Sequence, residues 1–475
     1  MRVRFSPGRA AGQVTMPASK SAAHRALLAA ALTPGVCEIS PLPQNEDIQA
    51  TVDCLTALGT RILRSPDGSR ATVYGCTGYF GKENEFSAGT GAENGGVAAF
   101  TPGTGADFSL SGGGFREDGK TCVLPCNESG FREEGKTYIL PCNESGFRED
   151  HKIYILPCNE SGSTLRLLLP SVLRGKTVRF TGAKRLFARP LSVYADICHR
   201  AGVAFSPAGE SLTVCGRLSP GTFAFPGNIS SQFVSGLLFA LPHLPGDSLI
   251  RLAPPVESAS YIEMTLRTLS RFGYTVKTGE TGLYRVPGGQ TGRAPERLTL
   301  PPDQSAAAFF GALSALSGGA VKIENDEVDP LQGDRVYRSA FAALSAGFAE
   351  IPVADCPDLS PVLMAFAALS GGARLTHTAR LRFKESDRGA AMAEELEKCG
   401  VRVTVNADDI LLSGGARRPT VPLSGHGDHR VVMALSVLLS VTGGEITGAE
   451  AVSKSLPEFF TLLRALGLSF EMTEE

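Results

Sequence analysis

One short pattern recurs six times along the chain, and it limits the folds that the chain can adopt. Each copy is an apolar run rich in alanine and leucine, followed by a glycine turn and a short β-like stretch. A glycine at a helix end commonly takes a left-handed conformation that stops the helix. The pattern predicts six α/β units, whose turn glycines, at spacings of 140, 71, 73, 53 and 72 residues, are Gly35, Gly175, Gly246, Gly319, Gly372 and Gly444.

The number of these units and the chain length predict a two-lobed protein. A chain of 475 residues is too long for one compact core, and six units divide evenly into three per lobe. Because the helical runs are almost wholly apolar, we expect the helices to pack inside each lobe and the sheets to be half exposed. The predicted fold class is α/β (α+β), with three repeats in each of two lobes.

The net charge and the hydropathy of the chain limit the classes of partner that it can bind. The formal net charge is −2, which disfavours nucleic acid and anionic membranes as partners, so any cationic site must be local. The amino terminus has no apolar run with a cleavage site, and no stretch approaches the roughly 20 apolar residues that span a bilayer. We expect a cytoplasmic protein that binds neither nucleic acid nor membrane.

The eleven cysteines indicate neither disulfides nor a metal site. Their number is odd, and only Cys122 and Cys126 are closely spaced. No Cys-x-x-Cys pair or nearby histidine pair accompanies them, so zinc is not expected. We expect reduced thiols, no metal and no cofactor.

Polar residues precede the six apolar runs. Serine, aspartate and asparagine there can cap a helix by accepting hydrogen bonds from its first N–H groups, which is the simpler interpretation of any single copy. Capping does not account for cations, which are disfavoured at the positive end of a helix dipole. Helix starts that meet at a cleft would bind phosphate and carboxylate, so the predicted substrates are small polyanions. The cations at these starts are Lys20, Arg25, Arg166 and Arg430.

A charged run between the fifth and sixth units opens another predicted helix, whose apolar side includes Ala391 and Leu396. Taken alone, the run is equally consistent with a solvated helix start. Its position between two cation-bearing units favours a functional role. The run consists of Lys384, Glu385, Asp387 and Arg388.

Eight short motifs, in this order, resemble the 5-enolpyruvylshikimate-3-phosphate synthase family. They are SKSAAHRALLAAAL at 19–32, SGSTLRLL at 161–168, ARP at 188–190, SSQF at 230–233, SASYIEMT at 258–265, KESDR at 384–388, DHRVVMAL at 428–435 and SKSLPEFF at 453–460. The resemblance implies transfer of the carboxyvinyl group of phosphoenolpyruvate to the 5-hydroxyl of shikimate 3-phosphate, with release of phosphate. The reaction would pass through a tetrahedral ketal and serve the shikimate pathway. Because the motifs reach both ends of the chain, no fused further enzyme is expected.

The resemblance also implies a fold. Each lobe would contain three βαβαββ units arranged as an inside-out α/β barrel, and the lobes would close over ligand. The first lobe would comprise residues 1–19 and 301–475, and the second lobe residues 20–300. A monomer that meets only its two small-molecule substrates is expected.

The resemblance assigns site residues motif by motif. Asp358 is expected to accept the proton of the 5-hydroxyl, and Glu385, with Lys20, to serve the methylene carbon. The residues implied for shikimate 3-phosphate are Lys20, Ser21, Arg25, Ser230, Ser231, Gln232, Ser258, Tyr261, Asp358 and Lys384. Those implied for phosphoenolpyruvate are Lys20, Gly162, Arg166, Arg189, Gln232, Arg388, Arg430 and Lys454. A donor with both phosphate and carboxylate needs several fixed cations, which this second set supplies.

Two places depart from the family pattern. Glu160 and Ser161 stand beside Gly162, where the family often has an amide and a small residue. Arg380 stands where some members bind substrate through asparagine. The departure at Glu160 and Ser161 leaves sensitivity to phosphoenolpyruvate mimics open, and no role is assigned to Arg380.

Two alternative functions remain. A sister enzyme transfers the same group to a UDP-sugar, but it carries Lys-Asn in the first motif and a reactive loop cysteine, where this chain has Lys20-Ser21 and KESDR. A non-catalytic relative would be a binding or scaffold protein. The intact set of Lys20, Asp358, Glu385 and Arg430 argues against that alternative.

A tandem repeat at 114–161 is inserted in the predicted second lobe. Its three units of 16 residues differ pairwise at only three or four positions, which indicates recent duplication. Each unit is typical of a hairpin fragment, but only the third runs into a helical segment. We expect Glu160 to Arg166 to form the site and 114–145 to protrude as an extra loop or ribbon.

Overall fold

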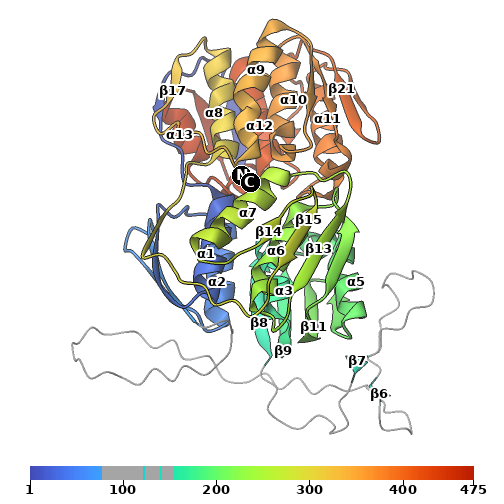
Figure 1. Cartoon of the computed structure of the whole chain (residues 1–475). Coiled ribbons are helices and arrows are strands. Elements are labelled where there is room, and N and C mark those ends of the chain that lie inside the picture. Colours follow the sequence, from blue (N-terminus) through green and yellow to red (C-terminus); the bar gives the residue numbers. More distant parts are fainter. Residues whose placement is uncertain (77–120, 123–139, 142–152, 475) are drawn as a thin grey trace.

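The structure is a computed structural model that describes residues 1–76, 121–122, 140–141 and 153–474. Figure 1 shows two lobes, one above the other, with α1 to α7 in the second lobe and α8 to α13 in the first. The helices of the second lobe are α1 (Lys20–Leu32), α2 (Glu46–Ala57), α3 (Gly162–Val172), α4 (Lys184–Ala188), α5 (Ser192–Arg200), α6 (Ser231–Ala240) and α7 (Ala259–Arg271). Those of the first lobe are α8 (Gln304–Leu316), α9 (Tyr337–Ala346), α10 (Ser360–Leu369), α11 (Arg388–Lys398), α12 (His429–Thr442) and α13 (Phe459–Ala465).

The predicted sixfold pattern is confirmed, because every apolar run is a helix and a strand follows each one. The pairs are α1 with β3 (Gly35–Ser40), α3 with β9 (Arg174–Gly182), α6 with β13 (Ser248–Ala253), α8 with β17 (Val321–Ile323), α10 with β19 (Ala373–Thr376) and α12 with β23 (Gly444–Thr447). The charged run likewise opens a helix, α11, which buries Ala391 and Leu396 as expected.

Five of these six strands lie second in a four-stranded sheet with one shared pairing pattern: a parallel pair followed by two antiparallel pairs. In the second lobe the orders are β16 (Arg297–Thr299), β3, β5 (Ala71–Gly75), β4 (Arg61–Arg64); β8 (Tyr154–Asn159), β9, β11 (Ser211–Arg217), β10 (Ala204–Ala208); and β12 (Thr222–Pro226), β13, β15 (Leu283–Val286), β14 (Lys277–Thr278). In the first lobe they are β22 (Leu423–Ser424), β23, β1 (Arg2–Phe5), β24 (Phe470–Thr473); and β18 (Ala349–Pro352), β19, β21 (Asp409–Leu412), β20 (Val403–Val405). The remaining strand, β17, makes a parallel pair with β2 (Gly12–Val14).

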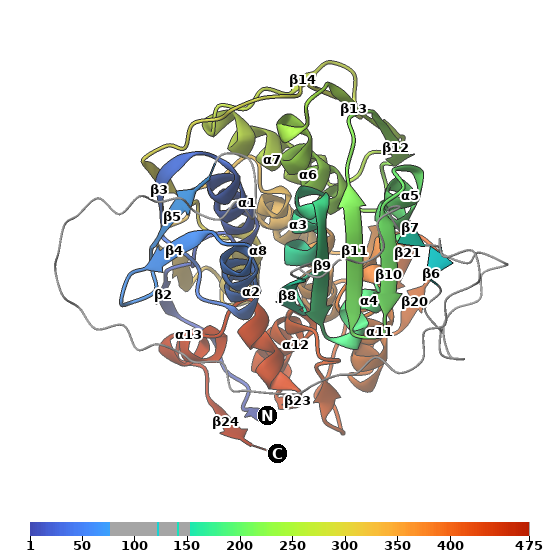
Figure 2. The same cartoon turned by 90° about the horizontal axis from the view of Figure 1, so that it is seen from below.

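The helices pack inside and the sheets face outward, as Figure 2 shows for the second lobe. Helix α12 buries twelve of its fourteen residues, whereas strand β13 alternates buried Ile250 and Leu252 with exposed Arg251 and Ala253. One face of each sheet covers the helices and the other meets water. This arrangement confirms the predicted α/β fold class and its inside-out lobes.

Two separate hydrophobic cores support the lobes. One contains buried residues between Ala18 and Leu300, and the other contains buried residues up to Met16 and from Ala307 onward. The chain passes between them twice at one place, where Ser19 N donates to Pro301 O at 2.8 Å. We propose that these cores mark the two domains expected at 20–300 and at 1–19 with 301–475.

A glycine turn follows directly after α8, α10 and α12, as predicted, whereas α1 and α3 end without one, and Gly35 and Gly175 lie inside the strands that follow them. Gly319 and Gly372, for example, both have φ of 86°, a backbone conformation that favours glycine. The prediction is wrong at Gly246, which does not have a positive φ. Helix α6 instead continues into the 3₁₀ helix η1 (Leu241–His243), where Pro242 has no N–H with which to extend an α-helix.

The third repeat unit belongs to the second lobe. Its end forms β8, which pairs parallel with β9, and α3 begins directly after it. Of the first two units the structure describes only β6 (Thr121–Cys122) and β7 (Leu140–Pro141), which pair antiparallel with each other. The rest of the expected protrusion at 114–145 lies outside the described residues and stays a prediction.

Candidate active site

A cavity between the lobes collects the starts of helices from both of them. The sequence-predicted residues that line it are Lys20, Ser21, Arg25, Gly162, Arg166, Arg189, Ser230, Ser231, Gln232, Ser258, Tyr261, Asp358, Lys384, Glu385, Arg388 and Arg430. Lys454 is not a lining residue. It lies in the 3₁₀ helix η5 (Ala449–Lys454), where its ammonium group contacts Glu160 and the carbonyl of Gly427.

Side chains cap five of the six central helices, so the capping interpretation is confirmed for these five. The caps are Ser19, Ser161, Ser230, Asp303 and Asp428, each accepting from an N–H in the first turn. The sixth, α10, follows the 3₁₀ helix η3 (Pro357–Leu359), which carries Asp358. The cations stand beside these caps in the same cavity, so capping and a cationic site occur together.

Arg25 and Arg166 are buried cations for which the described part of the chain offers no ion pair. Arg25 donates only to neutral oxygens, including Thr265 Oγ1 at 2.8 Å. Arg166 donates to Gln232 Oε1 at 3.1 Å, and its buried Nε has no hydrogen-bond partner. Burial lowers the pKa of Arg25 to about 10 and that of Arg166 to about 9. Uncompensated buried cations that line a cavity indicate an anionic ligand.

Gly162 allows two guanidinium groups to lie over the start of α3. A Cβ atom at this position would come within 2.6 Å of Arg189 Nη1 and 2.8 Å of Arg166 Nη1. Only the lack of a side chain leaves room for both cations. The glycine therefore shapes the second-lobe part of the cationic pocket.

Arg388, at the start of α11, joins three carboxylates. Its Nη1 lies 2.6 Å from Asp358 Oδ1, its Nη2 lies 2.6 Å from Glu385 Oε2, and its Nε lies 2.9 Å from Asp428 Oδ2. Burial alone would lower the pKa of this arginine, but the three carboxylates raise it. The guanidinium group is thus fixed in charge and in orientation.

Asp358 lies at the meeting point of three cations. Besides Arg388, it contacts Arg430 Nη2 at 3.2 Å and Lys384 Nζ at 3.1 Å. Burial opposes ionisation, but Arg430, Lys384 and Arg388 together hold the pKa of Asp358 well below its usual value. The group is an ionised carboxylate that can accept a proton or a hydrogen bond from a hydroxyl.

Glu385 connects the lobes. Its Oε1 lies 3.3 Å from Arg189 Nη1 of the second lobe, while Oε2 pairs with Arg388 of the first. Burial opposes ionisation, but Arg189 and Arg388 hold the pKa of Glu385 well below its usual value. The cavity therefore contains two ionised carboxylates that share one guanidinium.

Lys20 is paired with a residue that sequence reasoning missed. Its Nζ lies 2.8 Å from Asp47 Oδ2, and Asp47 also lines the cavity. Asp47 lies in the first turn of α2, behind the cap Asn45. In the sequence it looks like an ordinary acidic first turn, which is why no signal distinguished it.

Tyr261 is hydrogen-bonded across the lobes to another missed residue, Asp334. Tyr261 OH donates to Asp334 Oδ2 at 3.2 Å, and Ser305 Oγ donates to the same oxygen. Asp334 is fully buried, and its Oδ1 has no hydrogen-bond partner in the structure. Burial, with the nearby Asp358 carboxylate, raises the pKa of Asp334 to about 6.

Two further lining residues had no role in the sequence assignment. His429 is buried, neither of its ring nitrogens has a hydrogen-bond partner, and burial lowers its pKa to about 3, so the ring is neutral. Arg380, in the 3₁₀ helix η4 (Ala379–Phe383), donates to Ser258 Oγ at 3.1 Å and pairs with Glu257. His429 lies within a quoted motif, but nothing local showed that its ring would face the cavity.

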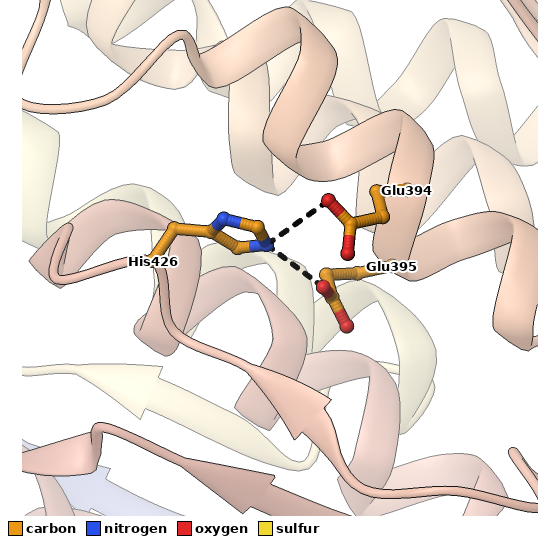
Figure 3. A group of neighbouring side chains, drawn as sticks. All are labelled: Glu394, Glu395 and His426. Atoms are coloured by element: carbon orange, nitrogen blue, oxygen red, sulfur yellow. Dashed lines mark hydrogen bonds and ion pairs between the residues drawn. The ribbon is translucent and has the colours of Figure 1, made fainter.

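One more cluster of titratable groups lies apart from the lining residues (Figure 3). The ring of His426 points at Glu395, with Nε2 2.7 Å from Oε1, and Glu394 lies beside them. Lys398 Nζ bridges both oxygens of Glu395 at 2.8 and 2.9 Å, and Ser424 N donates to Oε2 at 2.9 Å. The buried carboxylate is thus already satisfied by chain atoms. These contacts fasten the turn that precedes α12.

The comparisons with known proteins agree with this site. A family model described as EPSP synthase (3-phosphoshikimate 1-carboxyvinyltransferase) matches residues 6–99 and 127–463. The chain belongs to the EPSP synthase family. The resemblance predicted from the eight motifs is confirmed.

Relatives and solved structures extend the match along the chain. The 3-phosphoshikimate 1-carboxyvinyltransferase of Clostridium acetobutylicum is 31% identical over 98% of this chain and 97% of that protein. The enzyme of the same name from Brachyspira hyodysenteriae is 34% identical over 64% of this chain and 77% of that protein. An EPSP synthase structure from Acinetobacter baumannii superposes over 100% of both chains with a TM-score of 0.68 at 22% identity, which supports the fold. Within the described ranges, no helix has the length and apolar character needed to cross a membrane.

Proposed function

We propose that this EPSP synthase family member transfers the carboxyvinyl group of phosphoenolpyruvate to the 5-hydroxyl of shikimate 3-phosphate and releases phosphate. The observation that carries the proposal is the inter-lobe cavity, where uncompensated Arg25 and Arg166 lie opposite the ionised carboxylates Asp358 and Glu385. Two polyanionic substrates need the cations, and a proton-transfer reaction needs the carboxylates.

The cations fall into two groups within this proposal. Arg166, Arg189, Arg388 and Arg430 would bind the phosphate and carboxylate of phosphoenolpyruvate, together with Lys454, which lies outside the cavity lining. Arg25, Ser21, Tyr261 and the capped start of α6 would bind shikimate 3-phosphate. Helix starts favour such a ligand because their N–H groups and dipoles point at it. Lys20 lines the same cavity and would serve both substrates.

The two carboxylates would move the protons. Asp358 would take the proton of the 5-hydroxyl as that oxygen attacks C2 of phosphoenolpyruvate, while Glu385, with Lys20, would protonate C3 to give the tetrahedral ketal. Loss of phosphate from C2 and of a proton from C3 would then restore the double bond. Because both carboxylates are ionised in this structure, Glu385 would have to gain its proton as substrates bind. Arg388 stays positively charged and contacts both carboxylates. Its charge would therefore limit the change in electrostatic potential at Asp358 and Glu385 as their protons move.

The test is phosphate release by purified protein. We expect turnover with phosphoenolpyruvate and shikimate 3-phosphate, and none when UDP-N-acetylglucosamine replaces shikimate 3-phosphate. Turnover with the UDP-sugar alone would overturn the proposed acceptor, and binding of both substrates without turnover would favour the non-catalytic alternative. We further propose a cytoplasmic monomer with no nucleic-acid or membrane partner, which light scattering and cell fractionation would test.

A further inference from the structure

Glu160 takes part in a ring of charged and polar groups between the lobes, beside the second-lobe cations. It follows β8 of the second lobe, and its Oε2 contacts both Arg185 Nη2 and Lys454 Nζ. Arg185 belongs to α4 of the second lobe, whereas Lys454 ends η5 of the first. One carboxylate therefore neutralises a cation from each lobe.

The carbonyl of Gly427 closes this ring from the first lobe. Lys454 Nζ donates to Gly427 O at 2.8 Å, and Arg185 Nη2 donates to the same oxygen at 2.9 Å. Gly427 has φ of 60°, in the turn that the contacts of His426 fasten before α12. The carbonyl oxygen of Gly427 is thus held in place by its own lobe. Arg185 and Lys454 each contact this oxygen on one side and Glu160 on the other. We call Glu160, Arg185, Gly427 and Lys454 the 160–454 ring.

The ring fixes the orientation of Lys454. An ammonium group has three donors, and in this structure Gly427 O and Glu160 each accept one. A lysine held in this way loses less side-chain entropy when its third donor meets a ligand. Without Glu160, the long side chain would be restrained by one neutral acceptor alone.

The ring also lies next to the cationic pocket. Gly162, two residues after Glu160, lies beneath Arg166 and Arg189. The segment from Glu160 to Gly162 therefore places one carboxylate on the first-lobe cation and, at Gly162, leaves room for the guanidinium groups of Arg166 and Arg189. The negative charge of Glu160 therefore holds this segment against the first lobe and also positions Lys454.

We propose that Glu160 is a positioning residue for the phosphoenolpyruvate half of the site, acting through Lys454 and Arg185. The inference rests on the proposed function, since it takes Lys454 as a donor ligand. Glu160 itself does not line the cavity. It links closure of the lobes at this end of the cavity to the placement of the lysine.

The test is a set of charge-removing variants analysed by steady-state kinetics. Glu160→Gln keeps the shape of the side chain and removes its charge, and Glu210→Gln, at an exposed turn of the same lobe, is the matched control. We expect Glu160→Gln to raise KM for phosphoenolpyruvate at least about fivefold, with KM for shikimate 3-phosphate within about twofold of the parent value. A general structural defect would move both constants or the melting temperature, so this split is specific to positioning.

A second pair of variants tests Arg185, the second-lobe cation of the ring. Arg185→Ala should reproduce part of the rise in KM for phosphoenolpyruvate, while Lys184→Ala, an exposed neighbour in α4, should not. If both residues act through one ring, Glu160→Gln and Arg185→Ala combined should cost less than the product of their separate effects. These Arg185 measurements also keep the proposal testable if a Glu160 variant fails to fold.

The outcomes separate the inference from the proposed function. No turnover by the unmodified protein with phosphoenolpyruvate and shikimate 3-phosphate would overturn the proposed function. With normal turnover, a Glu160→Gln KM for phosphoenolpyruvate equal to that of Glu210→Gln would overturn only the positioning role. A lower KM would overturn it as well, because Glu160 would then be competing with the donor for Lys454.

Discussion

Arg388 Nε and Asp428 Oδ2 lie 2.9 Å apart, and their side chains are only 1% and 0% exposed. Asp428 also caps α12, because its Oδ1 accepts from Arg430 N at 2.9 Å. One buried carboxylate thus fixes both the arginine that Asp358 and Glu385 share and the start of the helix that carries Arg430. A substitution at Asp428 should therefore lower both the stability and the activity of the protein.

Asp428→Asn should lower the free energy of unfolding by about 3 kcal/mol, because removing one partner leaves a buried charge less compensated. Denaturant unfolding followed by circular dichroism would measure the loss. The matched control is Asp196→Asn on the exposed side of α5, which should change stability by less than about 0.5 kcal/mol. Equal stability of the two variants would show that Asp358 and Glu385 alone compensate Arg388.

Arg430→Ala should weaken phosphoenolpyruvate far more than shikimate 3-phosphate. Arg430 lines the cavity beside Asp358, and losing one charge-assisted contact to an anion costs on the order of 2–3 kcal/mol. Calorimetric titration with each substrate would give the two affinities. Equal losses for both substrates would contradict the assignment of Arg430 to the donor.

Asp358→Asn and Glu385→Gln should each lose turnover by at least about a hundredfold while substrate binding changes modestly. Both variants should fold, because Arg388 keeps Asp428 and one further carboxylate as partners. Rapid-quench kinetics would measure the chemical step, and equilibrium binding would serve as the check. Substantial turnover by a well-folded double variant would remove both groups from the mechanism.

Asp334 should make the stability depend on pH in the opposite sense to an ordinary paired carboxylate. Its folded pKa of about 6 lies above the usual value of 3.8, so the folded state binds the proton more tightly. The stabilisation is therefore complete below about pH 4 and is lost as the pH rises through about 6, by roughly 2–3 kcal/mol. Asp334→Asn should raise the melting temperature relative to the parent at pH 7.5 but not at pH 4.

The comparison between the two pH values isolates this carboxylate, since every other group titrates in both proteins. Asp196→Asn, at its exposed position, should show no such difference. A melting difference between Asp334→Asn and the parent that is the same at pH 4 and pH 7.5 would mean that Asp334 does not titrate in this range.

Deleting Gly114 to Ser145 should preserve activity within about threefold, because loop length costs little free energy once the ends are fixed. The third repeat unit supplies β8 and leads into α3, and the deletion leaves it whole. Strands β6 and β7 pair with each other and would be removed together. Phosphate release by the shortened protein is the measurement, and a folded but inactive product would assign the first two units to the working structure.

Much of the fold could be predicted because its signals are local. An apolar run, a glycine turn and a β-like stretch lie within about 25 residues of each other, so all six helix–strand pairs were found in the sequence. The prediction failed at Gly246 because Pro242 ended the helix by another route. The strand orders could not be predicted, since pairings such as β1 with β23 join the two ends of the first lobe.

Part of the candidate site could likewise be predicted from local motifs, and part of it could not. Motifs identified the cations of the site, and the structure brings all of them into one cavity except Lys454, which ends η5. Asp47 and Asp334 were missed because an acidic residue near a helix start is ordinary in sequence. Their roles depend on Lys20 and Tyr261, which approach them through the fold.

The sequence by itself determined the residue types at each helix start, the sixfold unit and the family. These follow from side-chain periodicity and from motifs, which are properties of short segments. Only the tertiary structure decided which cations are neutralised and which stay free for a ligand. Arg189 meets Glu385 across 196 positions of the chain, and Lys454 meets Glu160 from the opposite lobe. Charge interactions depend on distance in space and on burial, and two packed lobes set both in ways that no local segment contains.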